Sequence, residues 1–179
     1  MMDHQQVLDF WRSIGPEGWF RRNDVVDEAI RTKFGALHQQ AAAGGLASWG
    51  NEASPALALV IVLDQFSRNM FRNDPRAFAQ DELACEIASA ALAAGYDREV
   101  APDLGTFFFM PFMHSERIAE QERCVRLFHA ANEPESLKYA KTHRDVVRRF
   151  GRFPHRNPAL GRHTTDAERA FLDGGGFSA

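Results

Sequence analysis

The sequence predicts an all-α protein of about eight helices arranged as antiparallel hairpins. Three observations carry this prediction: helix start and stop signals recur along the whole chain, apolar residues between them recur at spacings of three and four, and no segment shows a run of strand alternation. The chain has 179 residues, 45% hydrophobic and 25% charged, which excludes an intrinsically disordered chain. We expect a single domain over residues 1–173 and a flexible tail over 174–179.

Each expected helix is bounded by a capping residue or proline and by a later stop. In chain order the boundaries are Asp3 to Gly15, Asn23 or Asp24 to Gly44, Ser54-Pro55 to about Phe66, Asp74-Pro75 to Gly95, a short piece from Pro102 to Phe109, Ser115 to Asn132, Pro134 to Gly151, and Thr165 to about Leu172.

The residue pattern within some of these segments also predicts where the helix lies or how it begins. Residues 57–63 are apolar on all sides, so the third helix is expected to be central. Thr165 and Glu168 have the spacing of a capping box. The pairs at 55–94 and 115–150 each span about one helical-repeat unit, although their sequences do not repeat.

The N-terminus, the longest apolar run and the number of cysteines bear on the compartment in which the protein is found. The N-terminus has no basic region followed by an apolar stretch, and the longest apolar run, residues 56–63, is far shorter than the roughly 20 residues that cross a bilayer. Two cysteines, Cys85 and Cys124, are too few for a disulfide scaffold. We expect a cytoplasmic protein with no membrane partner.

Three helix junctions combine polar side chains with aromatics. In the first, Asp64 ends the apolar helix, and Arg68 lies four residues on, so the two can pair on one face. Asn69 follows them. A charge at the end of a buried helix needs a partner or a ligand, and the alternative to ligand binding is that Asp64 braces the helix end through internal hydrogen bonds.

The second junction places His114 and Glu116 after a run of aromatic and methionine side chains, at the expected start of a helix. A helix start favours an anion, and a His–Glu pair can exchange protons near neutral pH. The alternative is that Ser115 caps the helix, Glu116 complements its dipole, and His114 is a buried turn residue.

The third junction is strongly basic. Residues 141–163 contain seven Lys or Arg and one Asp, a formal charge of +6, whereas the whole chain carries −3. The arginines can offer planar forks to phosphate or carboxylate. The alternative is that they pair with acidic helices, such as those carrying Asp81-Glu82 or Glu116 to Glu122.

Other chemistries find less support. No phosphate loop, dinucleotide fingerprint or Gly-x-Ser-x-Gly elbow occurs, so no cofactor is predicted. Metal-ligand pairs at helical spacing are lacking, so no metal is predicted. The overall acidity and the single short basic run argue against nucleic acid.

The three junctions resemble a known family. The motifs are Leu63-Asp64-Gln65-Phe66-x-Arg68-Asn69-Met70-Phe71-Arg72, Met110-Pro111-Phe112-Met113-His114-Ser115-Glu116 and Arg149-Phe150-Gly151-Arg152-Phe153-Pro154-His155-Arg156-Asn157. They are similar to those of the bacterial family named domain of unknown function 924, from the first helix to Leu172. The resemblance implies an all-α fold like that of tetratricopeptide-repeat proteins and implies no activity. One departure is Ser67, where the family pattern has proline.

We therefore expect a polar pocket for an anionic or phosphorylated small molecule, with catalysis open. The candidate acid–base residues are His114, Glu116 and His143. The candidate ligand-binding residues are Asp64, Arg68, Asn69, Arg152, His155, Arg156 and Asn157.

Two other functions are compatible with the same residues. Stacked helical pairs can form an open groove that binds an acidic peptide or protein. Alternatively, the polar junctions form an internal network that holds the helices in register.

Overall fold

The computed structural model describes residues 3–176, which contain helices and no β-strand, as predicted. These residues divide into two compact units. Unit 1 comprises residues 3–72 and 76–111, and unit 2 comprises residues 73–75 and 112–176. The single domain over residues 1–173 stays a prediction. Part of the expected tail, residues 177–179, lies outside the described residues.

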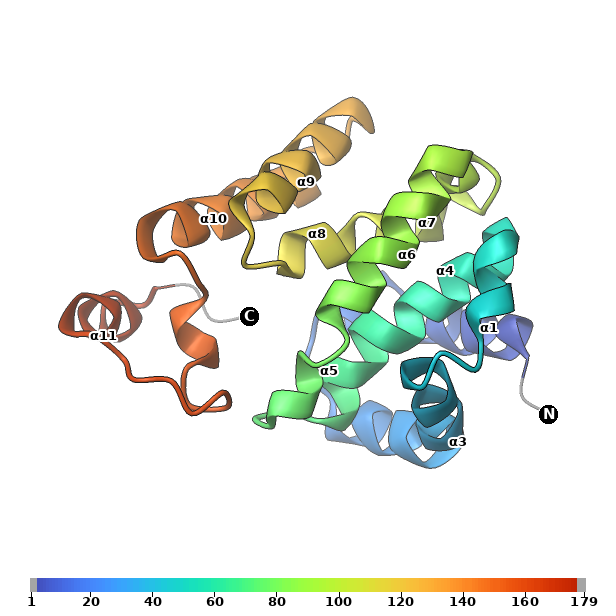
Figure 1. Cartoon of the computed structure of the whole chain (residues 1–179), viewed down its shortest axis with the longest axis horizontal. Helices are drawn as coiled ribbons and strands as arrows, with labels where there is room; N and C mark the ends of the chain where they lie inside the picture. The colour runs from blue at the N-terminus through green and yellow to red at the C-terminus, as the bar shows by residue number, and fades with distance from the viewer. Residues whose placement is uncertain (1–2, 177–179) are drawn as a thin grey trace. The chain divides into compact units, whose positions relative to one another are not determined.

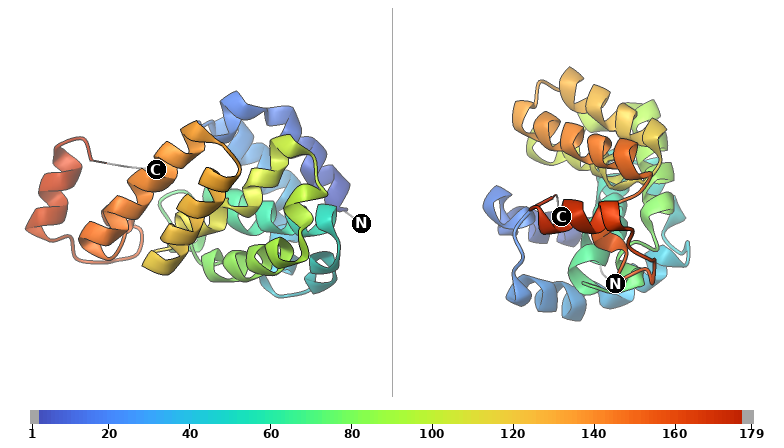
Figure 2. Two further views of the ribbon diagram at one scale, coloured as in Figure 1. Left: turned by 90° about the horizontal axis from the view of Figure 1, so that it is seen from above. Right: turned by 90° about the vertical axis from the view of Figure 1, so that its left-hand side faces the viewer.

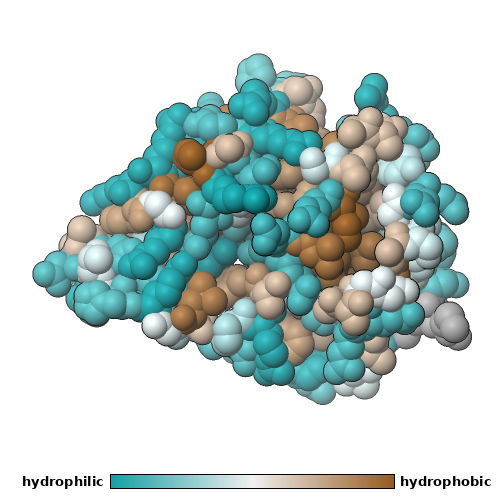
Figure 3. Space-filling view, in the orientation of Figure 1, coloured by the Kyte–Doolittle hydropathy of each residue, from teal (hydrophilic) through white to brown (hydrophobic). Residues whose placement is uncertain are grey.

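Unit 1 is built around α4. Its helices are α1 (His4–Ile14), α2 (Pro16–Trp19), α3 (Asp24–Ala42), α4 (Ala53–Ile61), α5 (Ser67–Met70), α6 (Asp81–Ala94) and α7 (Pro102–Gly105). Residues 55–63 are all buried, which fits the expectation of a central helix. α4 contacts both α1 and α6 (Figure 1), and hydrophobic residues show at the surface where α4 and α6 adjoin (Figure 3).

Aromatic side chains fill the space between α1, α3 and the end of α4. Phe34 and Phe66 lie 4.9 Å apart between ring centroids, and Trp11 meets Phe66 edge to face at 5.7 Å. All three side chains are at most 1% exposed. Large rings packed in this way contribute much of the hydrophobic stabilisation of a small core.

Unit 2 contains a helical hairpin and a short C-terminal helix. α9 (Ile118–Ala130) and α10 (Pro134–Phe150) pack side by side, as the gold and orange helices of Figure 2 show. α11 (Asp166–Asp173) follows a 3-10 turn at Pro154–Arg156. α8 (Met110–His114) begins in unit 1 and ends in unit 2.

Most of the predicted local signals are confirmed. Asp3 and Thr165 form capping boxes, and Asn23 caps α3 through its side chain. α10 begins at Pro134, and α6 and α10 end at glycines with positive φ, Gly95 at 81° and Gly151 at 69°. Such backbone angles favour glycine because it has no Cβ.

Three predicted helix starts are wrong. α4 begins at Ala53 after Glu52, so Pro55 is the third helical residue, where its missing N–H is still harmless. Asp74-Pro75 starts only a 3-10 turn, and α6 begins at Asp81. The helix expected from Ser115 begins at Ile118, because the Ser115 hydroxyl accepts from the N–H of Arg117 in a turn that precedes the helix.

The predicted end of the central helix at Phe66 is also wrong. After α4 the backbone continues as a π-helical segment, Val62–Phe66, and then as α5 to Met70. The Ser67 hydroxyl donates to the carbonyl of Leu63 at 2.5 Å and accepts from Nε2 of His38 at 2.8 Å. Ser67 and His38 are both buried, so these hydrogen bonds hold the end of the π segment against α3.

Asp64, in the π segment, pairs with Arg68 as predicted, at 2.9 Å. Replacing Asp64 with alanine is expected to lower the free energy of unfolding by about 3 kcal/mol, because a largely buried guanidinium loses one of its carboxylates. Urea denaturation measures this value. The matched variant Asp9→Ala removes an exposed carboxylate and should cost under about 0.5 kcal/mol. Equal losses in the two variants would contradict the prediction.

Candidate functional site

The first predicted junction forms a charge network within unit 1. Arg68 donates through Nη1 to Oδ1 of Asp64 and to Oδ1 of Asp81, and through Nη2 to Oδ2 of Asp81, each at 2.9 Å. Asp64 is fully buried, and its other oxygen accepts from the Gln65 amide. π-helical segments often occur at functional sites, but the geometry of these three charged side chains is that of an internal ion network.

Asn69 belongs to a neighbouring network. Its amide donates to Oδ1 of Asp27 on α3 at 2.8 Å, and Arg72 also bonds to both oxygens of Asp27. These bonds tie α3 to the end of α5 across a separation of more than 40 residues. A ligand-binding role for Asp64, Arg68 and Asn69 stays a prediction.

In unit 2, Glu116 closes the loop that follows α10. Its carboxylate accepts from the backbone N–H of Phe153 at 2.8 Å and from both Nη atoms of Arg162 at 2.7 and 3.0 Å. Burial works to raise the pKa of Glu116, but these hydrogen bonds outweigh it and hold the pKa below its ordinary value. As a base, Glu116 would have to leave Arg162. It follows α8 and does not fall at a helix start, contrary to the prediction.

A second carboxylate organises the C-terminal helix. Glu168 accepts from Arg152 at 2.7 and 2.9 Å, from the Asn157 amide at 3.2 Å, and from the backbone N–H of Thr165 at 2.8 Å. The hydrogen bonds from Arg152 lower the pKa of Glu168 to about 2. The contacts of Arg152 and Asn157 are those of a structural network, and their predicted ligand-binding role is untested.

The basic segment is thus paired internally at several points, as the alternative interpretation proposed. Arg144 bonds to Asp145, Arg148 to Glu122 on α9, Arg152 to Glu168, and Arg162 to Glu116. Much of the +6 charge of residues 141–163 is therefore used in ion pairs that stabilise the hairpin and the loop after it.

Four of the predicted site residues lie together in unit 2, three of them around the ring of Phe153. His143 on α10 lies 6.4 Å from His114 and 5.7 Å from Phe153 between ring centroids, and His155 lies 5.6 Å from Phe153. The guanidinium carbon of Arg156 is 4.6 Å from the centre of the Phe153 ring, and its Nη2 donates to the carbonyl of His114 at 2.8 Å. We call His114, His143, His155 and Arg156 the imidazole cluster.

The surroundings of His143 fix its chemical state. The side chain is 6% exposed, and Nδ1 bonds to the carbonyl of Tyr139 at 2.8 Å. A carbonyl can only accept, so Nδ1 carries the proton and Nε2 is the basic nitrogen. Burial lowers the pKa of His143 to about 3, the Tyr139 carbonyl opposes this, and the charges of His114, Arg156 and His155 lower it further. His143 is therefore neutral at pH 7.

Sequence reasoning missed the groups that hold the cluster in place. Phe153 is fully buried and touches His143, His155 and Arg156. Gln121, also fully buried, donates to the carbonyls of Met113 and Ser115 on either side of His114. The motif around Phe153 was a usable signal, but nothing in the sequence marks Gln121.

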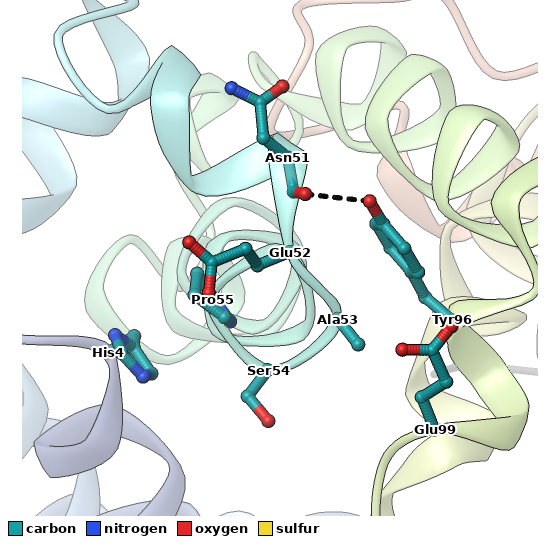
Figure 4. A pocket seen from close by; sticks show the side chains of 8 residues that line it. All are labelled: His4, Asn51, Glu52, Ala53, Ser54, Pro55, Tyr96 and Glu99. Carbon is teal, nitrogen blue, oxygen red and sulfur yellow. Dashed lines mark hydrogen bonds between the residues drawn. The ribbon is translucent and has the colours of Figure 1, made fainter.

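A separate pocket of about 580 Å³ lies in unit 1 at the N-terminus of α4 (Figure 4). Its lining residues are His4, Asn51, Glu52, Ala53, Ser54, Pro55, Tyr96 and Glu99. The Tyr96 hydroxyl donates to the carbonyl of Asn51 at 2.8 Å. The helix N-terminus favours an anion, whereas Glu52 and Glu99 favour a cation, so the lining selects neither charge.

No helix within residues 3–176 is long and apolar enough to cross a membrane. Over the same residues, no group of three or more His, Cys, Asp or Glu side chains is arranged to hold a metal ion.

Comparison with known proteins gives the family and no activity. The family model described as "Bacterial protein of unknown function (DUF924)" matches residues 7–176. A solved structure described as a protein of unknown function, ATU0120 from Agrobacterium tumefaciens, is 41% identical and has a TM-score of 0.92, over 96% of this chain and 97% of that chain. No curated protein matches the chain.

The neutral state of His143 predicts acid sensitivity. Because its folded pKa of about 3 lies below the unfolded value near 6.5, the unfolded chain binds a proton first as the pH falls. The contribution of His143 to the free energy of unfolding is fully present above about pH 6.5. It falls between about pH 6.5 and 3, by at most about 1.4 kcal/mol per pH unit. The difference in unfolding free energy between wild type and His143→Gln should therefore shrink on acidification. Denaturation of both proteins at several pH values measures this difference. If it stays constant as the pH falls, His143 is not a buried neutral imidazole.

Proposed function

Since the chain belongs to the bacterial family of unknown function DUF924, we propose that the imidazole cluster of unit 2 binds a small oxyanion, such as phosphate, a phosphomonoester or a carboxylate. The observation that carries this proposal is the gathering of two imidazoles and a guanidinium around Phe153, with the His114 imidazole beside that of His143. Groups that are cationic or able to become so favour an anion when they lie together away from water.

In the proposal, Arg156 supplies the guanidinium of the site. Arg156, whose side chain is buried, contacts a carbonyl oxygen and an aromatic face within the unit. A guanidinium in this setting can hold two oxygens of a phosphate or carboxylate in its plane.

The cluster also contains a candidate base. His143 is neutral, and its Nδ1–H is fixed on the Tyr139 carbonyl, which leaves Nε2 as the nitrogen that accepts a proton. In the proposal Arg156 holds the anion, His114 and His155 donate hydrogen bonds to it, and His143 is the acid–base residue if the protein is an enzyme. Glu116 orients the loop that carries Arg156.

The other finer expectations stay predictions. A tetratricopeptide-like groove for an acidic peptide would use the α9–α10 hairpin, whose outer face carries Lys138 and Lys141, both exposed. A cytoplasmic location fits Cys85 and Cys124, which form no disulfide.

Phosphate titration tests the proposed site. Replacing Arg156 with glutamine should weaken phosphate binding about tenfold or more in isothermal titration calorimetry, because charge-assisted hydrogen bonds to the anion are lost. Arg126→Gln, the same change on the exposed part of α9, should leave the affinity within about twofold of wild type.

A second variant guards against a folding defect in the first. His114→Gln keeps the size and polarity of the side chain, so circular dichroism should match wild type while phosphate binding falls. The proposal fails if the wild-type protein binds neither phosphate nor small di- and tricarboxylates, or if Arg126→Gln weakens binding as much as Arg156→Gln.

A further inference from the structure

We infer that Gln121 is a positioning residue of the proposed anion site, because it orients the end of α8 so that His114 meets Arg156 and His143. This inference rests on the proposed function, since the site that Gln121 serves is the imidazole cluster. Gln121 belongs to α9, is fully buried, and is not itself a member of the cluster. All of these residues lie in unit 2.

Three successive carbonyls at the end of α8 accept hydrogen bonds from side chains of other segments. Nε2 of Gln121 donates to the carbonyl of Met113 at 2.7 Å and to that of Ser115 at 2.6 Å. Nη2 of Arg156 donates to the carbonyl between them, that of His114, at 2.8 Å. The last carbonyls of a helix have no partner within it, so these two side chains supply the partners that the end of α8 lacks.

The orientation of the Gln121 amide is determined by the atoms that it meets. A backbone carbonyl only accepts hydrogen bonds, so the nitrogen of the amide, and not its oxygen, faces the two carbonyls. Both hydrogens of Nε2 are then used, one on each side of His114. α9 in turn holds Gln121, whose backbone N–H donates to the carbonyl of Arg117 at 3.1 Å.

Holding these three carbonyls fixes the backbone at His114. Each peptide unit is planar, so the direction of its carbonyl constrains the orientation of the whole plane. Gln121 therefore constrains the two outer planes, and Arg156 constrains the plane between them. The φ and ψ angles of His114 follow from two of these planes, and they direct its side chain toward the His143 ring, 6.4 Å away between centroids.

Loss of the Gln121 amide removes two of these three constraints. The segment then samples other backbone conformations, in which the His114 carbonyl turns away from Arg156 and the imidazole moves away from His143. In the proposed function Arg156 holds the anion and His114 donates to it, so a site that is no longer preorganised binds more weakly. Gln121 thus acts on anion binding through these two residues and need not touch the anion.

Calorimetric titration with phosphate compares two variants with the wild-type protein. Gln121→Met keeps the length of the side chain and removes its donors, whereas Gln121→Asn keeps the amide but is one methylene too short to span both carbonyls. Each should weaken phosphate binding about fivefold or more, the effect of losing about one net hydrogen bond. Gln39→Met, the same change at an exposed position of α3, should leave the affinity within about twofold of wild type.

A second measurement separates positioning from a loss of stability. The His114 ring resonances in NMR spectra report the environment of the imidazole in the folded protein, and they should shift in both Gln121 variants. The exposed ring of His129, at the end of α9, should keep its wild-type resonances. Ser67→Ala, which removes buried hydrogen bonds in unit 1, should lower stability while the His114 resonances and the phosphate affinity stay unchanged.

The outcomes separate the inference from the proposed function. If the wild-type protein binds phosphate and both Gln121 variants bind it as tightly, the inference is overturned and the proposed function stands. Unshifted His114 resonances in a folded variant overturn the inference as well. It is also overturned if neither variant has the circular dichroism spectrum of the wild-type protein, because Gln121 then serves the folding of the whole unit. A wild-type protein that binds neither phosphate nor small carboxylates overturns the proposed function, and the positioning role falls with it.

Discussion

A carboxylate held away from water needs a cation beside it, and arginine meets that need throughout this molecule. In unit 1, Asp64 pairs with Arg68 and Asp27 with Arg72. In unit 2, Glu116 pairs with Arg162 and Glu168 with Arg152. Apart from Asp64 and Arg68, each pair joins segments well separated in the chain, so the pairs fix the π segment, the loop after α10 and α11. Removing one partner leaves the other charge largely buried and less well compensated.

The imidazole cluster is organised around an aromatic ring. His143, His155 and Arg156 contact Phe153, and His114 lies beside His143. Burial holds His143 neutral, which lowers the electrostatic cost of placing these groups together. Titratable groups with displaced pKa values are more frequent at functional sites than elsewhere. This gathering of basic groups is the reason for proposing the binding site here.

Hydrogen bonds between residues close in the chain could be predicted from the sequence, whereas contacts between distant residues could not. Asp3, Asn23 and Thr165 cap helices through bonds to residues two or three positions away, so their spacing alone predicts them. The π segment shifts the hydrogen-bond register without altering the apolar pattern, so nothing in the periodicity marks it. The sequence analysis paired Glu116 with its close neighbour His114. In the structure, Glu116 forms an ion pair with Arg162, 46 residues away. The sequence analysis named His114, His143, His155 and Arg156 as candidates, but it did not single out Phe153, which three of them contact.

The Ser67 hydroxyl has a consequence for how this chain and its relatives diverge. A proline at position 67 would offer no hydroxyl, so the buried His38 imidazole would lose the acceptor for its Nε2–H and keep its packing against Phe71. Histidine at 38 and serine at 67 are thus a matched pair, and a lone exchange at either position strands a polar group in the core. Across homologous chains we expect the two positions to covary, with an apolar side chain at 38 accompanying proline at 67.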